Sequence, residues 1–288
     1  MTLISLDNSS IPENNTSAIR IRETRCNTLV HPLNFGKADG YTANLYKGCT
    51  HGCIYCYAPS LTHDERKWGT YVDAKVNAPE VLERELRSLE KQQVFLSSAS
   101  DPYQPVEAKY KLTRRCLEIL DRYNFPVSIL TRSPLVLRDL DLITKFGWIK
   151  VGMSITTVPV RQFEPGVPPL PRRIETLRRL AQEGIKTWVS LAPVIPGIIL
   201  TDLESLFQEL KDAGVRSVSF GILRFAGYEE SKSMFEEAAG FTADEALSGR
   251  EELVAKLSTL IEKFGMQADD TIMNWSSSPA NFPLDNFF

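Results

Sequence analysis

The sequence predicts an α/β fold built around a parallel β-sheet, and two observations lead to this prediction. Short apolar runs rich in β-branched residues recur through the middle of the chain, and segments with apolar residues at helical spacing lie between them. Strands and helices that alternate in this way are typical of right-handed βαβ units. The periodicity is compatible with an open, doubly wound sheet and with a partly closed barrel. The six expected strands lie at 43–47, 93–98, 126–131, 149–155, 186–192 and 215–223.

The expected helices follow from apolar spacing and from signals at their ends. Gly184 and Gly214 fall where two helices should end before the next strand. An N-cap residue followed three positions later by glutamate marks helix starts at Asn77, Thr201 and Ser248. The apolar stripes of three helices are formed by Leu112, Cys116, Leu117 and Leu120, by Ile174, Leu177 and Leu180, and by Leu203, Leu206, Phe207 and Leu210.

We expect these elements to form a single domain. Residues 1–40 are polar and poorly periodic, and we interpret them as an irregular N-terminal extension. Residues 41–225 carry the alternation of strands and helices. Residues 226–288 break the pattern, with one strong helix at about 249–264 and an aromatic tail.

Composition bounds the class of protein. With 288 residues, 43% of them hydrophobic and 24% charged, the chain can bury a sizeable core. The net charge of −3 gives no sign of a nucleic-acid or membrane partner. No signal peptide is visible, and no run approaches the roughly 18 apolar residues of a membrane span. Three of the five cysteines lie within eight residues, which argues against a disulfide framework and for the cytoplasm.

The strongest chemical signal is the loop KGCTHGCIYCYAP, which follows the first expected strand. It holds Cys49, Cys53 and Cys56 at the carboxyl end of a strand, where ligand sites of such folds collect. Thiolates suit iron–sulfur clusters and zinc. A four-iron cluster held by three cysteines leaves one iron open to a cofactor or substrate. Gly48 and Gly52 allow the backbone to approach a cluster closely.

Two plainer interpretations of this loop remain open at this point. The three cysteines could bind a structural zinc ion with His51 or His31 as the fourth ligand, although no second ligand pair is present. They could also hold a purely structural iron–sulfur cluster. Otherwise His51 is expected to face solvent or to form a hydrogen bond. Cys116 lies on an apolar helix stripe, so we expect it in the core.

The cysteine loop, with Tyr55 just before the third cysteine, resembles the cluster motif of the radical S-adenosylmethionine superfamily. Within it, NLYKGCTHGCIYCYAP, KVNAPEVLERELR, SSASDPYQPVE and LTRS are similar to the spore photoproduct lyase-like (DNA-repair-photolyase-like) group over about residues 40–225. The resemblance implies a six-stranded parallel (β/α)6 partial TIM barrel with a short N-terminal extension and a helical C-terminal cap. It also implies a [4Fe-4S] cluster that reductively cleaves S-adenosylmethionine to a 5′-deoxyadenosyl radical, which abstracts hydrogen from substrate.

The same resemblance suggests which residues hold S-adenosylmethionine. Ser98, Ser100 and Asp101, after the second strand, are candidates for its amino group, although a turn is the alternative. Arg132 and Arg173 are candidates for its carboxylate, although both could be solvated. The cofactor-binding residues expected on this basis are Tyr55, Ser100, Asp101, Arg132, Ser154 for the ribose, and Ile195 with Gly197 for the adenine.

The substrate does not follow from the sequence. SSASDPYQPVE lacks the cysteine that spore photoproduct lyase uses near its second strand, so lyase activity of that kind is doubtful, and the catalytic residues are unknown. Tyr55, Tyr57 and Tyr103 could relay a hydrogen atom or simply pack. A nucleic-acid base is one candidate substrate, a protein, peptide or small molecule is the alternative, and a non-catalytic metal-binding scaffold is a third reading. An electron donor such as a flavodoxin or ferredoxin is expected.

Overall fold

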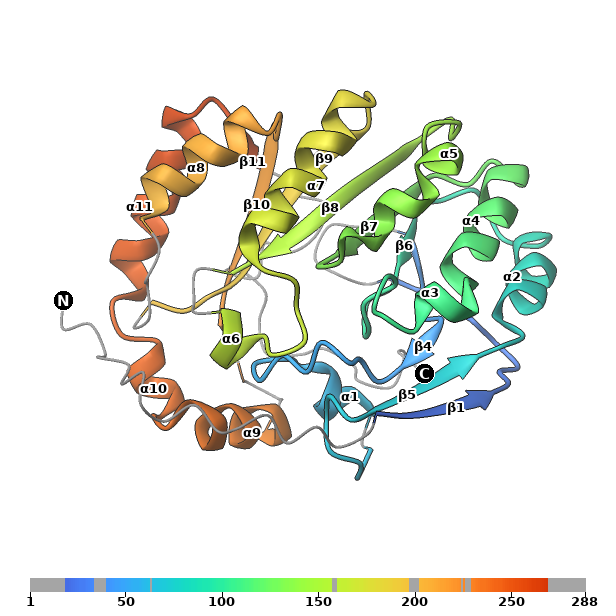
Figure 1. Cartoon of the computed structure of the whole chain (residues 1–288), viewed down its shortest axis with the longest axis horizontal. Helices are drawn as coiled ribbons and strands as arrows, with labels where there is room; N and C mark the ends of the chain where they lie inside the picture. The colour runs from blue at the N-terminus through green and yellow to red at the C-terminus, as the bar shows by residue number, and fades with distance from the viewer. Residues whose placement is uncertain are drawn as a thin grey trace.

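The computed structural model describes residues 19–33, 40–62, 64–156, 160–196, 202–223, 225 and 229–268. It is a mixed α/β fold, as the sequence predicts (Figure 1). The strands are β1 Arg20–Thr24, β2 Val30–Pro32, β3 Tyr41–Ala43, β4 Tyr46–Lys47, β5 Tyr71–Lys75, β6 Val94–Leu96, β7 Val127–Thr131, β8 Ile149–Ile155, β9 Lys186–Val194, β10 Ser217–Ile222 and β11 Gln267–Ala268. The helices are α1 Ala58–Thr62, α2 Ala78–Leu86, α3 Glu107–Tyr110, α4 Leu112–Arg122, the 3₁₀ helix η1 Pro134–Asp139, α5 Leu140–Ile143, α6 Val160–Phe163, α7 Leu170–Gln182, α8 Leu203–Asp212, α9 Glu229–Ala239, α10 Ala243–Ala246 and α11 Arg250–Lys263.

A large sheet dominates the described residues. Its eight strands follow the order β11-β10-β9-β8-β7-β6-β3-β2. All neighbours in it are parallel except β2, which is antiparallel to β3 at the edge. The helices α2, α4, α5, α7, α8 and α11 lie in an arc along one side of this sheet (Figure 1). The carboxyl ends of its parallel strands therefore meet at one edge, where the site described below lies.

The side chains of the central strands alternate between two environments. In β8, Val151, Met153 and Ile155 pack into the apolar clusters beneath the helices. Ser154 lies between them in sequence and faces the other side, where it lines a cavity. Its register partner on β9 is Ser190, which lines the same cavity. This period of two gives the sheet an apolar face toward the helices and a face with hydroxyl groups toward the site.

The first predicted strand, 43–47, is split in the structure. Ala43 ends β3 in the large sheet, whereas Tyr46 and Lys47 form β4, which pairs antiparallel with β5 in a separate three-stranded sheet. The Asn44 side chain lies at the division, where its Oδ1 accepts a hydrogen bond from the Ala99 amide at 2.8 Å. The other five predicted strands are confirmed, with small shifts at their ends.

The prediction of an irregular N-terminal extension is wrong for two segments. β1 pairs in parallel with β5, and β2 pairs with β3. The sequence of β1, RIRET, lies on the surface, so it carries no apolar alternation that could have marked it as a strand. Backbone hydrogen bonds to β5 define it instead.

Some of the predicted helix starts and ends agree with the structure, and others do not. Gly184 and Gly214 follow α7 and α8 with φ of 77° and 83°, as expected for glycines that end helices. Asn77 is the N-cap residue of α2, but its side chain makes no capping bond. Ser248 does not cap α11, which follows Gly249 instead. The predicted start at Thr201 lies outside the described residues.

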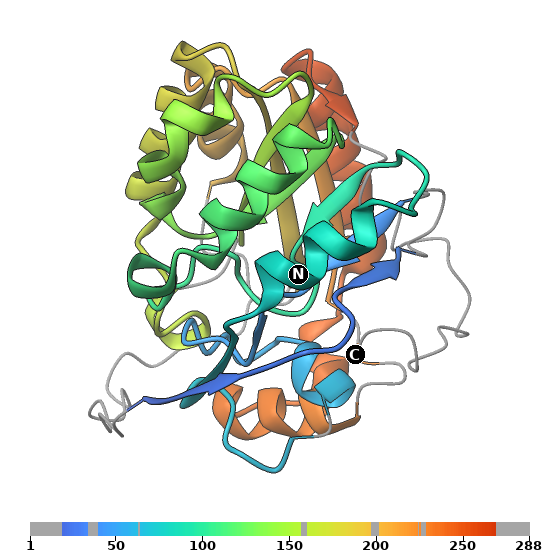
Figure 2. The ribbon, with the colours of Figure 1, turned by 90° about the vertical axis from the view of Figure 1, so that its right-hand side faces the viewer.

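The C-terminal region divides into two parts. α11 packs on α8, because its Leu253, Leu257 and Leu260 join the apolar cluster beneath α8. β11 follows α11 and extends the large sheet next to β10. This part continues the sheet and its helix layer and does not cap it. α9 instead packs on α1, away from the helices that line the large sheet (Figure 2). No helix in the described residues is long and apolar enough to span a membrane.

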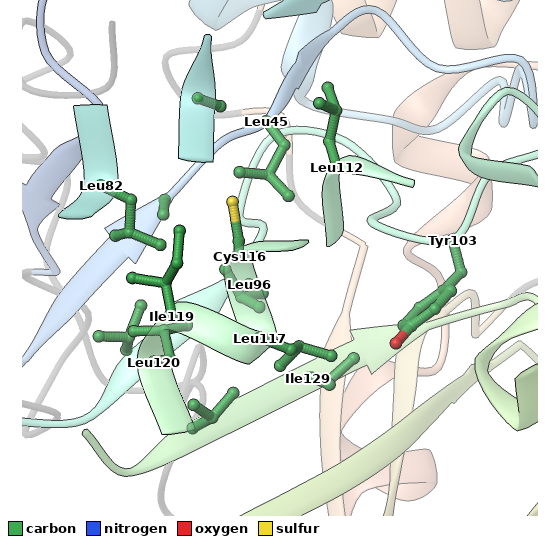
Figure 3. Packing of buried hydrophobic residues seen from close by; sticks show 14 of the residues in the cluster. Leu45, Leu82, Leu96, Tyr103, Leu112, Cys116, Leu117, Ile119, Leu120 and Ile129 are labelled. Carbon is green, nitrogen blue, oxygen red and sulfur yellow. The ribbon is translucent and has the colours of Figure 1, made fainter. Parts of the chain in front are cut away.

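The expectation that Cys116 is a core residue is confirmed. Its side chain is fully buried and packs with Leu117, Leu120 and Leu96 between α4 and the sheet (Figure 3). The five cysteines are all free thiols. Cys116 is thus separate from the three cysteines of the loop in position and in environment.

Candidate functional site

A cavity that is partly open to solvent lies at the carboxyl ends of the parallel strands. The loop after β4 forms one wall with the three cysteines of the predicted motif. The ends of β6, β7, β8, β9 and β10, or the loops that follow them, form most of the rest, together with Trp68 before β5. Side chains from several separate segments therefore meet at one place, as is usual for sites in parallel α/β folds.

Cys49, Cys53 and Cys56 all line this cavity, so the structure brings the predicted ligands together. Gly48, just before them, has φ of 85°, and a Cβ there would lie 2.4 Å from the Tyr71 carbonyl oxygen. Only glycine fits this position. The close approach fixes the start of the cysteine loop against β5.

The donor set fits an iron–sulfur cluster. Burial raises the pKa of the Cys53 thiol well above its usual range and that of Cys56 to about 12, so both would release protons when they bind metal. Within the described ranges, no three His, Cys, Asp or Glu side chains are grouped to hold one metal ion. A four-iron cluster takes its thiolates on different irons, and three cysteines line this one cavity.

One side chain and one backbone segment hold the cysteine loop. The Gln104 amide accepts a bond from the Thr50 backbone N–H at 3.0 Å and donates one to the Gly48 carbonyl at 3.1 Å. On the opposite side, Gly166 N–H donates to the His51 carbonyl at 2.9 Å. The loop is therefore fixed through its backbone, which leaves its cysteine side chains available.

Asp101 lines the cavity, but its carboxylate is already engaged. It accepts bonds from Thr131 Oγ1 at 2.6 Å, the Arg132 amide at 2.7 Å and the Tyr103 amide at 2.8 Å. Burial alone would raise the pKa of Asp101, but His51 and these hydrogen bonds lower it. The carboxylate thus ties together the loops that follow β6 and β7.

His51 is not solvent-facing, contrary to one expectation, because only 2% of it is exposed. Its Nδ1 lies 3.3 Å from Asp101 Oδ2, without the alignment of a hydrogen bond. Burial opposes protonation, but Asp101 and Cys49 outweigh it and raise the pKa of His51 to about 10. His31, the other proposed zinc ligand, lies on β2 and is not among the cavity residues.

Ser98 and Ser100 both line the cavity after β6. Ser100 Oγ donates to the Tyr46 carbonyl at 3.2 Å, so its oxygen remains able to accept a bond from a bound ligand. Ser98 Oγ accepts a bond from Thr42 at 3.0 Å and lies 3.1 Å from Asn44 Nδ2. Of the two, Ser100 is the better acceptor for an ammonium group.

Arg132 and Tyr55 line the cavity, and both contact Glu164. Arg132 Nε donates to Glu164 Oε1 at 3.1 Å, and the Tyr55 hydroxyl donates to the same oxygen. Arg173 also binds Glu164, at 2.9 Å, and donates to the Ser154 carbonyl. Arg173 is fully buried, so the alternative expectation that it lies on a solvated face is wrong, and it is not among the described residues that line the cavity.

Of the remaining residues predicted to contact the cofactor, Ser154 lies in the cavity wall and Ile195 does not. Ser154 lines the cavity and donates to the Ala192 carbonyl at 3.3 Å. Ile195 is fully buried in an apolar cluster with Cys53 and Tyr55, and it is not part of the cavity wall. Ala192, three residues earlier on β9, lies in the wall instead. Gly197 lies outside the described residues.

Of the three tyrosines considered as hydrogen-atom relays, two line the cavity and one does not. Tyr55 and Tyr57 line the cavity, and the Tyr57 hydroxyl donates to the Ser98 carbonyl. Tyr103 points into the core (Figure 3), where its hydroxyl lies 3.1 Å from Asp139. Tyr103 is therefore excluded as a group that meets a ligand in this cavity.

Three residues of the site were missed from the sequence. Glu164 is one of 36 acidic residues, and nothing around it in sequence marks it. Ser190 lies inside an apolar strand, and the strand period could have placed it beside Ser154. Trp68 lines the cavity, and its indole N–H is buried without a partner in the described part of the chain. Its segment gave no periodic signal.

Comparisons with known proteins agree with this site. Residues 43–210, more than half of the chain, match the Radical SAM superfamily. The chain is similar to the uncharacterized protein MJ0683 of Methanocaldococcus jannaschii, with 38% identity over 187 residues, 62% of this chain and 70% of that protein. It is also similar to the Radical SAM Nalpha-GlyT isomerase of Pseudomonas phage M6, with 29% identity over 195 residues, 65% of this chain and 40% of the isomerase.

Among solved structures, spore photoproduct lyase complexed with dinucleoside spore photoproduct has a similar fold. The TM-score is 0.65 with 19% sequence identity, and the match covers 86% of this chain and 81% of the lyase. The family implies an iron–sulfur cluster and S-adenosylmethionine as cofactors. The three cysteines that line the cavity are ligands of the kind that an iron–sulfur cluster takes. This chain therefore belongs to the radical SAM superfamily of enzymes.

Proposed function

We propose that this enzyme binds a [4Fe-4S] cluster through Cys49, Cys53 and Cys56 and uses it to cleave S-adenosylmethionine. When bound and reduced, the cluster supplies the electron that breaks the carbon–sulfur bond, and the resulting 5′-deoxyadenosyl radical abstracts hydrogen from substrate. The convergence of the three cysteines on one cavity carries this proposal. The scaffold is a single domain with a six-unit (β/α)6 partial barrel, for which α9 and α10 form the cap.

The residues of the cavity support distinct contacts with S-adenosylmethionine. Arg132 is the side chain for its carboxylate, because a guanidinium offers several N–H donors in one plane. Ser100 retains an oxygen that can accept from its amino group, while Asp101 holds the two loops in place. Ser154 is the candidate for the ribose hydroxyls.

Product analysis after anaerobic reconstitution tests this function. The iron- and sulfide-loaded protein, reduced with dithionite, should convert S-adenosylmethionine to 5′-deoxyadenosine and methionine. Protein carried through the same procedure without iron should form neither. Absence of 5′-deoxyadenosine from fully loaded protein, with or without candidate substrates, would instead favour a non-catalytic metal-binding scaffold.

A nucleic-acid base is the first candidate substrate, because the solved structure of similar fold is a spore photoproduct lyase with a bound dinucleoside. A base is uncharged and carries hydrogen-bonding atoms. Part of the cavity wall suits such a group, because it is formed by the hydroxyl-bearing side chains of Ser97, Ser98, Ser154 and Ser190.

A protein, peptide or small molecule is the second candidate, and the charge of the cavity favours it. Among the described residues that line the cavity, Arg132 is the one arginine or lysine, and Glu164 already binds it. A nucleic acid requires several phosphate contacts and would bind with a steep dependence on salt. Binding of a single-stranded oligonucleotide that weakens steeply with salt would support a nucleic acid, and salt-independent binding of a peptide would support the alternative.

The electron donor proposed from the sequence is a flavodoxin or ferredoxin. Three cysteines within eight residues fit a reducing compartment such as the cytoplasm better than a disulfide framework. Reduction of the loaded protein by flavodoxin, with its reductase and NADPH, should then replace dithionite in the product assay.

A further inference from the structure

Glu164 is a fully buried carboxylate directly behind the wall of the cavity. It follows the last residue of α6, and its segment also supports the cysteine loop, because the Ile54 amide donates to the Phe163 carbonyl at 3.1 Å. A Cβ on Gly166, two residues later, would lie 2.3 Å from the Thr50 carbonyl oxygen. The position of Glu164 is therefore fixed relative to the cysteines.

Three donors converge on this one carboxylate. Oε1 accepts from Arg132 Nε and from the Tyr55 hydroxyl, and Oε2 accepts from Arg173. Burial would raise the pKa of Glu164, but Arg173 and Arg132 outweigh it and lower the pKa. One negative charge thus faces two guanidinium groups, so the cluster keeps an excess positive charge.

Of the two arginines, Arg132 is the one that lines the cavity, so its positive charge faces a bound ligand. Arg173 is fully buried, whereas 21% of the Arg132 side chain is exposed and it lines the cavity. Its Nε is used by Glu164, and its backbone N–H is bound by Asp101. Among the described residues, Arg132 Nη1 has no hydrogen-bond partner, so this edge of the guanidinium can receive an anionic group.

We propose that Glu164 is a positioning residue that fixes Arg132 and Tyr55 so that Arg132 presents its free edge to the carboxylate of bound S-adenosylmethionine. This inference rests on the proposed function, since it concerns the same cofactor. Arginine has many rotamers, and a guanidinium held by a buried carboxylate loses less freedom when the ligand binds. Glu164 itself meets neither the cofactor nor the cluster.

Glu164→Gln tests the proposal with little change in volume. The neutral amide has one acceptor oxygen and an NH₂ group that faces a guanidinium, so it cannot hold Arg132, Tyr55 and Arg173 together, and without the negative charge Arg132 is held less firmly. The affinity for S-adenosylmethionine should fall about tenfold or more, the equivalent of one charge-assisted hydrogen bond. Iron and sulfide content should stay at the wild-type level, because the three cysteines are unchanged.

Glu107→Gln is the matched control. Glu107 is also fully buried and binds an arginine, Arg138 at 2.7 Å, as well as a tyrosine, Tyr46. Neither partner lines the cavity. This variant should lose stability without losing affinity for the cofactor.

The measurements are equilibrium dialysis of labelled S-adenosylmethionine against the loaded proteins and the change in the electron paramagnetic resonance spectrum of the reduced cluster on binding. Decarboxylated S-adenosylmethionine should bind wild type and Glu164→Gln equally, because it lacks the group that Arg132 holds. Equal loss for both ligands, or no loss for either, would overturn the proposal.

Further outcomes distinguish a variant that does not fold, a failure of the proposed function and a failure of the role of Glu164. If Glu164→Gln does not fold, Glu164→Asp keeps the charge but shortens its reach, and it should show a smaller loss that is again confined to the carboxylate-bearing ligand. Failure of the loaded wild type to bind S-adenosylmethionine would overturn the proposed function itself. Binding by wild type that Glu164→Gln reproduces would overturn only the role of Glu164.

Discussion

Cys53 lies between the cavity and an apolar cluster that contains Tyr55, Phe163 and Ile195. Its thiol therefore has one side for a ligand and another side closed by packed side chains. A cluster held by three thiolates has no spare ligand, so loss of any one leaves two of its irons without a protein ligand. The residue thus has no structural substitute.

Cys53→Ala should abolish retention of the cluster. The expected result is little iron or sulfide per chain after anaerobic reconstitution and desalting, with near-complete loss of cluster absorbance. Cys116→Ala is the matched control, because Cys116 is a buried thiol of the core. It should load normally and lose only stability. Full loading of the Cys53 variant would count against the ligand assignment.

Gly166→Ala tests the contact that supports the cysteine loop. The added methyl group would lie 2.3 Å from the Thr50 carbonyl oxygen, and backbone atoms cannot move as a flexible side chain would. We expect a cluster that is lost several times faster on desalting, together with destabilisation of about 1–3 kcal/mol. In Gly147→Ala the methyl group meets nothing within 4 Å, so this variant should retain the cluster as wild type does.

At this scale, sequence reasoning succeeded where the signal was local. The three cysteines are close in sequence, so their spacing alone predicted a shared site. Ser100 and Arg132 were named from the family resemblance, which points to the ends of the second and third strands, and both line the cavity. Glu164 was not found, because its role comes from contacts with residues 32 and 109 positions away. No pattern along the chain records such contacts.

At the scale of elements, the small sheet β1-β5-β4 forms the support beneath the cysteine loop. Charged side chains link its strands. Asp73 on β5 binds Arg22 of β1 at 2.9 Å and Arg66 at 2.7 Å, and Arg66 also binds Asp64 at 2.6 Å. Burial would raise the pKa of Asp73, but these arginines outweigh it and lower the pKa to about 2.

This network predicts acid sensitivity with a defined sign. A carboxyl group whose pKa is lower in the folded chain than the ordinary value of 3.8 stabilises the fold above that value, and its contribution disappears as the pH falls toward 2. Because Arg22 is largely exposed, we expect about 1–2 kcal/mol from Asp73. Urea unfolding of cluster-free protein near pH 5 and near pH 3 measures it. Asp73→Asn should lose less stability than wild type over this interval, and an equal loss would refute the prediction.

The elements that sequence reasoning located are those with one buried face. β8, with every residue buried, and α4, with its apolar stripe, carry periodic patterns that survive in sequence. Two of the strands it missed, β1 and the two-residue β11, are exposed, whereas β5 was missed although four of its five residues are buried. Their pairing is decided by backbone hydrogen bonds to neighbours distant in sequence, which leave no pattern in side-chain type.

At the scale of the whole molecule, the described residues form three apolar clusters with different tasks. Two lie between the sheet and its helices. The third joins the cysteine loop to the C-terminal α9 and α10, and Phe235 is its centre. The centroid of the Phe235 ring lies 6.2 Å from that of Phe163, 5.1 Å from that of Phe225 and 5.7 Å from that of Phe241.

The third cluster therefore closes the side of the cysteine loop that faces away from the cavity. A buried hydrogen bond of 2.9 Å between Ser60 of α1 and Ser231 of α9 fixes the same contact. An iron–sulfur cluster is sensitive to its exposure to solvent. The C-terminal helices thus contribute to the site through packing, without supplying a side chain to the cavity wall.

Phe235→Ala should separate this protective task from general stability. Removing a fully buried ring costs about 3–5 kcal/mol and leaves a cavity in the apolar cluster that contains Cys53. The loaded variant should lose cluster absorbance in air several times faster than wild type. Leu257→Ala is the control, because it creates a comparable cavity, at about 2–5 kcal/mol, in the cluster beneath α8 and α11. If both variants lose the cluster at the same rate, the loss reflects reduced stability, and α9 has no specific part in shielding the site.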